Sequence, residues 1–228
     1  MTSAPVAPDT FGMTSSTMTP GTAIARNAKW ITLGLLVLTV GQLAVATFVP
    51  GLTQFEGKGF AARLLLYPAM MLAVPAIWLL RRRRDQLGRR DQRDPVARND
   101  SPPWAAFAWI MLPFLVDVTG NTFNLYDSMW WWDDVNHLVN WLFLSLGVGL
   151  LLGRAGVRPG WALGLLIAGV GAAMAIGWEV GEYYAFIRNG TELDTAYTDT
   201  LGDEVLGTLG ASIAGLIIAR RAAIEPGR

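Results

Sequence analysis

Nine acidic side chains and one histidine are the candidate functional residues of this chain. Each acid lies at or just beyond the end of a long apolar stretch, and the histidine lies among them. A carboxylate at the centre of a membrane helix costs on the order of 3 kcal/mol, and less toward the interface, so acids gathered at such ends indicate a functional site. The set is Asp117, Asp127, Asp133, Asp134, Glu179, Glu182, Asp199, Asp203, Glu204 and His137.

The spacing of these residues suggests metal ligands. Asp133 and Asp134 precede His137 by four and three positions, and Glu179 precedes Glu182 by three. Such pairs share one face of a helix. Oxygen ligands with one imidazole suit Mg, Mn, Fe or Zn better than copper. We predict a divalent metal site with the ligands Asp134, His137, Glu179, Glu182 and Asp203, and further pocket residues Asp117, Asn121, Asp127, Asp133, Asp199 and Glu204, without assigning a catalytic residue.

Several of these residues have a simpler interpretation. Asp199 could cap the start of a helix, and His137 could be hydrogen-bonded to a neighbouring acid without binding a metal. Glu179 and Glu182 end a helix, where the helix dipole disfavours negative charge. The negative charge of these two glutamates must therefore be compensated. The candidates are Arg188, Lys58, a metal ion or protonation.

The elements that position these residues are membrane spans. Of the 228 residues, 52% are apolar and 16% are charged, and the apolar residues come in blocks near the ~20 residues that cross a bilayer. The blocks predict an all-α fold, a polytopic bundle of six transmembrane helices. They cover approximately 30–50, 60–80, 104–120, 135–152, 161–178 and 201–219.

Basic residues set the expected orientation. Most Arg and Lys fall on one side of six alternating spans, so the positive-inside rule puts both termini in the cytoplasm and the acidic ends outside. The orientation of the protein in the membrane is enough to explain a short basic loop between two spans, so we expect no nucleic-acid partner. The expected partners are membrane lipid and other membrane subunits.

Composition divides the chain into five parts. We predict a disordered cytoplasmic tail (1–28), two scaffold helices (29–80), an Arg-rich cytoplasmic loop (81–103), a functional bundle of four helices (104–221) and a second tail (222–228). Recurrent glycines in the last four spans predict close helix packing. At least one of Trp130, Trp131 and Trp132 should turn inward, because successive helix positions point about 100° apart.

The motifs together resemble a family of small bacterial membrane proteins known as YjdF-like, which is distantly similar to the VanZ-like proteins. The resemblance covers roughly residues 110 to 215. It rests on Asp117–Asn121 followed by LYD, the Asp134 and His137 pair, WExxE at Glu179 and Glu182, and DTLGD at 199–203. It implies a helical protein of the inner membrane. The VanZ-like relatives are associated with glycopeptide resistance, which points to the cell envelope.

Three functions fit these features. The first is an accessory or assembly subunit of the cell envelope with an outward-facing acidic and histidine pocket. The second is a metal-dependent membrane enzyme that acts on an envelope lipid or a lipid-linked substrate. The third is a cation or proton transporter, although the inward halves of the last four spans carry no ionisable residue.

Overall fold

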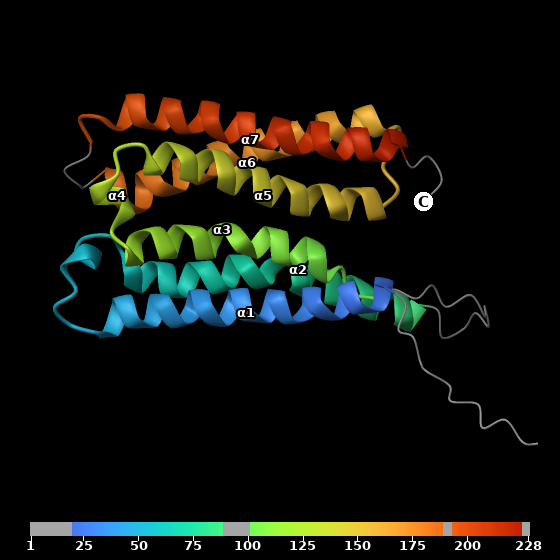
Figure 1. The fold of residues 1–228 in the computed structure, drawn as a ribbon, viewed down its shortest axis with the longest axis horizontal. Coiled ribbons are helices and arrows are strands. Elements are labelled where there is room, and N and C mark those ends of the chain that lie inside the picture. Colours follow the sequence, from blue (N-terminus) through green and yellow to red (C-terminus); the bar gives the residue numbers. More distant parts are fainter. Residues whose placement is uncertain (1–19, 89–100, 189–192, 225–228) are drawn as a thin grey trace, which may run out of the picture.

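Six long helices form the part of the protein that the structure describes, as the apolar blocks predict (Figure 1). The computed structural model describes residues 20–88, 101–188 and 193–224, which contain helices but no strand. Each long helix is apolar and long enough to cross a membrane. The long helices are α1 (Pro20–Phe48), α2 (Phe60–Gly88), α3 (Trp104–Thr122), α5 (Trp132–Arg154), α6 (Gly160–Glu182) and α7 (Ala196–Ile224), and the short ones are η1 (Thr53–Phe55), α4 (Leu125–Ser128) and the π-helical turn η2 (Tyr183–Ile187).

The six helices form two halves of three. Helices α1, α2 and α3 pack together around one apolar core, and α5, α6 and α7 around another (Figure 1). The halves meet chiefly where α3 packs along α5. The short elements η1, α4 and η2 all lie at the same end of the bundle, opposite the start of α1 and the end of α7.

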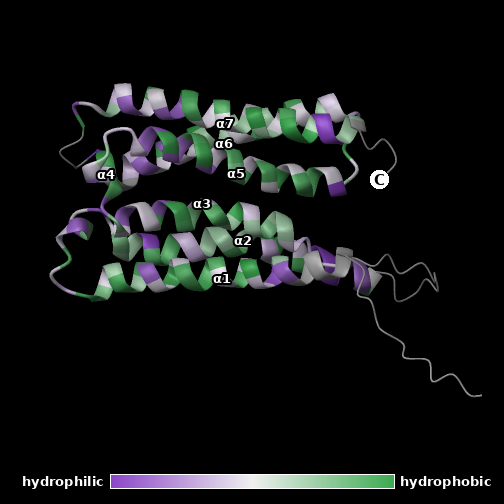
Figure 2. Ribbon diagram, viewed as in Figure 1, coloured by the Kyte–Doolittle hydropathy of each residue, from purple (hydrophilic) through white to green (hydrophobic). Residues whose placement is uncertain are grey.

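The outer surface of the bundle is apolar along most of its length. Figure 2 shows hydrophobic residues along the middle of the helices, with hydrophilic residues concentrated toward the ends. Large apolar side chains such as Val37, Leu65 and Leu165 are more than half exposed. Water would disfavour such a surface, whereas hydrocarbon matches it, so the helices belong in a bilayer.

Several helix boundaries differ from the sequence prediction, and α1 begins at Pro20, within the predicted tail. Helix α2 continues to Gly88, so Arg81–Arg84 extend the helix and do not form a loop. Arginine is a good helix former, and no proline interrupts this stretch. Helices α5 and α7 begin three and five residues earlier than the apolar blocks, so Asp133 and Asp199 lie within them. Residues 1–19, 89–100 and 225–228, which include most of the predicted tails and part of the Arg-rich loop, lie outside the described residues.

Glycines bring α6 and α7 close together. A Cβ atom added at Gly164 would stand 2.9 Å from the backbone oxygen of Gly215, and one added at Gly171 would collide with the Cβ of Ala211. Small residues at these crossings therefore let the two helices approach backbone to backbone. This packing fixes the position of α7, and hence of Asp203, relative to α6.

Gly171→Ala should destabilise the protein, whereas Gly169→Ala on the same helix should not. The added methyl at 171 meets Ala211 and Ser145, but nothing lies within 4 Å of a Cβ at 169. Overpacking of this kind costs about 1 to 3 kcal/mol. Thermal unfolding of both variants in one detergent measures the difference, and equal melting temperatures would contradict the packing described here.

Candidate functional site

A cavity of about 510 Å³ opens at the end of the bundle that carries the short elements. Five of the six long helices, all but α1, contribute residues to its wall, and the loop after η1 adds Lys58. Most of the acids singled out in the sequence line it, although they lie up to 86 positions apart. The predicted site residues that line the cavity are seven acids with one asparagine and the histidine: Asp117, Asn121, Asp127, Asp133, His137, Glu179, Glu182, Asp199 and Asp203.

His137 is surrounded by carboxylates from three helices. Its Nδ1 lies 3.0 Å from Oδ1 of Asp203 on α7 and 3.6 Å from Oδ1 of Asp133, one turn earlier on α5. Its Nε2 lies 3.4 Å from Oε1 of Glu179 on α6. The side chains of Glu179 and Asp203 are almost fully buried, and that of His137 is 11% exposed. Both ring nitrogens of the imidazole therefore face acids inside the bundle.

These groups lie at separations that a metal ion could use. Ligand atoms of Asp133, His137 and Asp203 lie within 4.8 Å of one another, and so do those of His137, Glu179 and Glu182. Ligands bound at about 2.1 Å to one ion stand roughly 3 Å apart when they are at right angles. The donors are carboxylate oxygens with one imidazole, a set that suits Mg, Mn, Fe or Zn. The residues present therefore fit a divalent ion.

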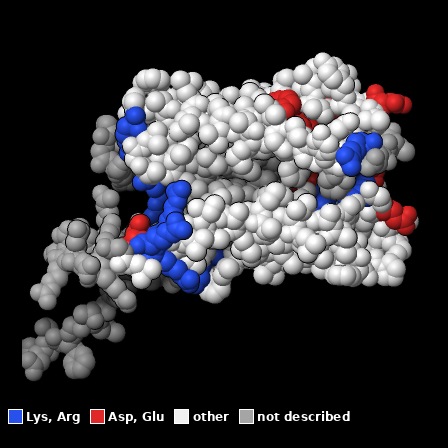
Figure 3. All heavy atoms as spheres, turned by 180° about the vertical axis from the view of Figure 1, so that it is seen from behind, with Lys and Arg blue, Asp and Glu red and all other residues white. Residues whose placement is uncertain are grey.

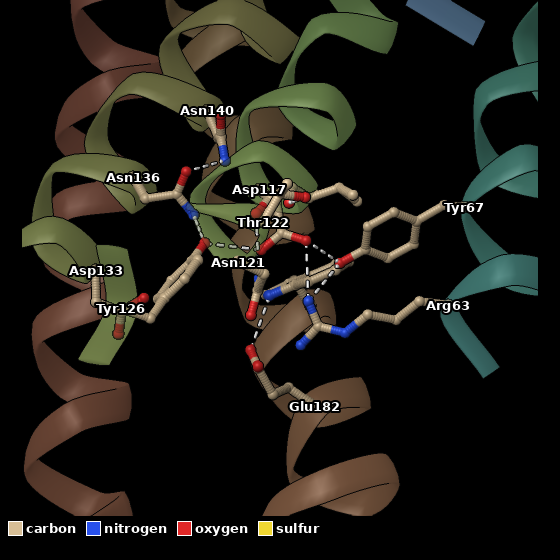
Figure 4. A network of polar contacts seen from close by, with 12 residues as sticks. Arg63, Tyr67, Asp117, Asn121, Thr122, Tyr126, Asp133, Asn136, Asn140 and Glu182 are labelled. Atoms are coloured by element: carbon tan, nitrogen blue, oxygen red, sulfur yellow. Dashed lines mark hydrogen bonds and ion pairs between the residues drawn. The ribbon is translucent and has the colours of Figure 1, made fainter. Parts of the chain in front are cut away.

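Asp117 on α3 is the centre of a second polar group (Figure 4). Its Oδ2 accepts hydrogen bonds from Nη1 of Arg63, at 2.9 Å, and from the hydroxyl of Tyr67, at 2.7 Å, both on α2. Its Oδ1 accepts a bond of 2.7 Å from the hydroxyl of Tyr126 on α4. The side chains of Arg63 and Asp117 are largely buried, so this ion pair lies away from bulk water.

A chain of hydrogen bonds extends from Asp117 to helix α5. The side-chain amide of Asn136 donates to the hydroxyl of Tyr126, and Nδ2 of Asn140 donates to Oδ1 of Asn136 at 2.8 Å (Figure 4). Burial, together with the neighbouring carboxylate of Asp117, raises the pKa of Tyr126 well above its ordinary value. Tyr126 therefore stays protonated and remains a donor. The Asn140 Oδ1 is buried in the cavity wall and has no hydrogen-bond partner among the described residues.

Two predicted site residues, Asp134 and Glu204, lie outside the cavity lining. Asp134 is exposed, and its neighbour Asp133 approaches His137 in its place. The physical reason is helix geometry, because adjacent residues point about 100° apart and only one of the two acids can face the bundle. The same geometry separates Glu204 from the buried Asp203.

Helix α2 also contributes to the cavity, although its span was predicted to be scaffold. Arg63 and Tyr67 both line the cavity. The partners of the two glutamates also differ from those predicted. Trp178 Nε1 donates a hydrogen bond of 2.9 Å to Oε2 of Glu182. Arg188, one of the predicted partners, packs on the ring of Tyr184. An arginine just inside an apolar block is costly, and Arg63 could have been identified on that ground.

One of the three consecutive tryptophans turns inward. Trp130 is 89% exposed, whereas the ring of Trp132 packs edge-on against Tyr126 with centroids 6.4 Å apart. Its Nε1 is buried beside Gly120. Trp132 thereby holds Tyr126 in position against Asp117.

Sequence comparison places this arrangement in a family. A family model described as "Predicted membrane protein (DUF2238)" matches residues 35–223, which include every residue of the site. The chain belongs to this family. No curated protein and no solved structure shows significant similarity to the chain. The DUF2238 description agrees with the six membrane helices of the fold.

Asp117→Asn should destabilise the DUF2238 protein much more than Asp127→Asn. Removing the charge of Asp117 breaks its buried ion pair with Arg63, a change that costs about 3 to 5 kcal/mol. The pair of Asp127 with Lys58 has one carboxylate that is 52% exposed, and such pairs contribute at most about 1 kcal/mol. Thermal unfolding in detergent compares the two variants, and a similar loss for both would contradict a central role for Asp117.

Proposed function

We propose that the protein is a metal-dependent membrane enzyme that acts on an envelope lipid or a lipid-linked substrate. The observation that carries this proposal is the position of His137, which has carboxylates from three helices at metal-ligand separations inside a cavity of about 510 Å³. Ligand pockets typically measure about 300 to 1,000 Å³. The cavity is therefore large enough for a substrate beside an ion.

Charge balance favours a cation at this position. Asp117 is paired with Arg63 and Asp127 with Lys58, whereas Asp133, Glu179, Glu182 and Asp203 gather around a single imidazole. Like charges this close raise each other's free energy, and burial adds to the cost. A divalent ion would offset that cost at one of two positions, either with Asp133, Asp203 and Nδ1 of His137 or with Glu179, Glu182 and Nε2 of His137.

The residues of the cavity have separate roles in this proposal. A bound divalent ion would lower the pKa of a water ligand and polarise the substrate. A carboxylate of the cluster that is not a ligand would accept the proton of that water, as a general base within hydrogen-bond distance. Arg63 and Lys58 also line the cavity, each paired with an aspartate.

A second candidate is an accessory or assembly subunit of the cell envelope. One observation favours it: His137 contacts Asp203 and Glu179 directly, so a protonated imidazole could satisfy the acids without a metal. The cluster would then be a structural ion network. Metal content separates the two candidates.

We further propose that the protein lies in the bacterial inner membrane with both termini in the cytoplasm. Arg81–Arg84, Arg154, Arg158 and Arg220 lie toward the end opposite the cavity, where Figure 3 shows a group of basic side chains. The positive-inside rule makes that end cytoplasmic and turns the cavity outward. The resemblance to YjdF-like and VanZ-like proteins supports a role in the envelope.

Single cysteines test this orientation, because the chain has none of its own. Glu56 and Ala223 are both exposed and lie at opposite ends of the bundle. A membrane-impermeant maleimide should label Glu56→Cys in intact cells, and should label Ala223→Cys after the membrane is opened. Labelling in the reverse order would contradict the orientation.

Two neighbouring acids test the metal site. Asp133→Asn should lower the bound divalent metal, because Asp133 lies with His137 and Asp203, whereas Asp134→Asn should leave it unchanged. His137→Ala should lower it further. Losing an orienting partner alone costs ~10 to 100-fold in affinity. Elemental analysis and metal titration of the purified variants measure the effect, with thermal unfolding as a control for folding.

The wild-type protein decides between the candidates. Stoichiometric metal that falls in Asp133→Asn and His137→Ala supports the enzyme. If the wild type binds no divalent ion in titration, the accessory-subunit function stands and the enzyme is rejected.

A further inference from the structure

One ring nitrogen of His137 already has a partner on its own helix. Nδ1 lies 3.2 Å from the backbone carbonyl oxygen of Asp133, one turn earlier on α5. A carbonyl oxygen can only accept a hydrogen bond, so this contact assigns the ring proton to Nδ1. The carboxylates of Asp203 and Asp133 lie on the same side, at 3.0 and 3.6 Å from Nδ1. Ionised carboxylates are acceptors as well, so all three oxygens favour a proton on Nδ1.

The lone pair of a neutral imidazole is then on Nε2, which faces Glu179. Nε2 lies 3.4 Å from Oε1 of this glutamate. A charge-assisted N–H···O bond is shorter, at about 2.7 to 2.9 Å. The observed separation matches two ligands of one ion, because atoms bound at about 2.1 Å in a tetrahedral arrangement stand roughly 3.4 Å apart. A cation between Nε2 and Glu179 therefore fits this side of the ring.

Glu182 is the second carboxylate on the Nε2 side. It follows Glu179 by three positions on α6, so the two side chains share one face of the helix. Trp178 Nε1 donates a hydrogen bond of 2.9 Å to Oε2 of Glu182. Carboxylates that bind a metal are commonly held by such outer hydrogen bonds. One ligand atom from each of His137, Glu179 and Glu182 lies within 4.8 Å of the others. Two of these three residues are thus held in place by a neighbouring group.

We propose that the divalent ion binds at Nε2 of His137 with Glu179 and Glu182 as its carboxylate ligands, and that Asp203 positions the imidazole from the Nδ1 side without binding the ion. This inference rests on the proposed function, because it chooses between the two positions open to the same ion. Three protein ligands leave a coordination position for water or substrate, as catalytic zinc sites do. All three ligands line the cavity, from which a substrate would reach the ion.

The Nδ1 side is the poorer position for an ion. A metal on Nδ1 would replace the proton that this nitrogen shares with the carbonyl of Asp133. The nitrogen of a histidine that binds metal is set by the hydrogen bond of the other nitrogen, often one from Nδ1 to a backbone carbonyl. The carboxylate of Asp133 is also 42% exposed and can be solvated by water, whereas that of Glu179 is 5% exposed. The buried Glu179 therefore gains more from a cation.

The single histidine of the chain makes the metal-bound nitrogen measurable. Full-length protein is labelled with the NMR-active nitrogen isotope at histidine alone and purified without a histidine tag, so its spectrum contains one imidazole. Zinc is the probe, because it has no redox chemistry and binds such donors more tightly than manganese or iron. We expect zinc to shift the resonance of Nε2, while Nδ1 keeps its bonded proton. Zinc bound at Nδ1, or at neither nitrogen, would overturn the proposal.

Two acid-to-amide substitutions separate a ligand from a positioning residue. Glu182→Gln replaces a charged ligand, so zinc affinity should fall by more than about 100-fold, beyond the loss of an outer partner. Asp203→Asn keeps an acceptor oxygen beside Nδ1, so affinity should fall only about tenfold. Asp133 contacts Nδ1 as well, and its loss should act in the same way. In Asp203→Asn the Nδ1 resonance should change while zinc stays on Nε2.

Zinc titration measures both affinities, and thermal unfolding shows whether both variants are folded. A larger loss in Asp203→Asn than in Glu182→Gln would overturn the proposal. Wild-type protein that binds zinc at Nδ1 would overturn the position and leave the metal-dependent enzyme in place. Wild-type protein that binds no divalent ion would reject the proposed function, and this position with it.

Discussion

The burial of charge at the ends of membrane helices is the constraint on which this structure depends. Each carboxylate near the bilayer is costly unless a cation or a hydrogen-bond donor meets it. Asp117 is met by Arg63, Tyr67 and Tyr126, which come from two other elements. The ring nitrogens of His137 in turn contact the carboxylates of Asp203 and Glu179 on two further helices. These two centres tie five of the six long helices together at one end of the bundle.

Helix packing along the rest of the bundle makes this convergence possible. Glycines at the crossing of α6 and α7 bring the backbones close, which carries Glu179 and Asp203 to the same imidazole. The two halves meet along α3 and α5, and these helices carry Asp117 and His137. The cavity therefore lies at the junction of the halves, where polar groups from both can reach it.

The cavity combines two environments. Its outer part holds carboxylates, an arginine and an imidazole, and its inner part is lined by aromatic and aliphatic side chains. An amphipathic ligand can satisfy both parts at once, with its charged group at the helix ends and its chain at the depth of the lipid hydrocarbon. A purely structural ion network would account for the outer part but not for an apolar space that continues past it.

The fold class and the six spans follow from the sequence alone, and the sequence also predicts most of the acids that the tertiary structure gathers in one cavity. The lengths of the apolar blocks are enough to predict the spans. The thickness of the hydrocarbon core sets the length of a membrane helix, and the backbone within it must be hydrogen-bonded internally. The rarity of charge in such blocks identified Asp117, His137, Glu179 and Asp203 as neighbours of a site.

Only the tertiary structure decided which side chains meet. Asp133 and Asp134 have the same chemistry and adjacent positions, and the rotation of α5 about its axis turns one to His137 and the other outward. Arg63 and Tyr67 enter the site because α2 packs against α3, which is a long-range contact that local periodicity does not encode. Apolar spans are stabilised in lipid whatever their neighbours, so their order around the bundle depends on packing and polar contacts between helices.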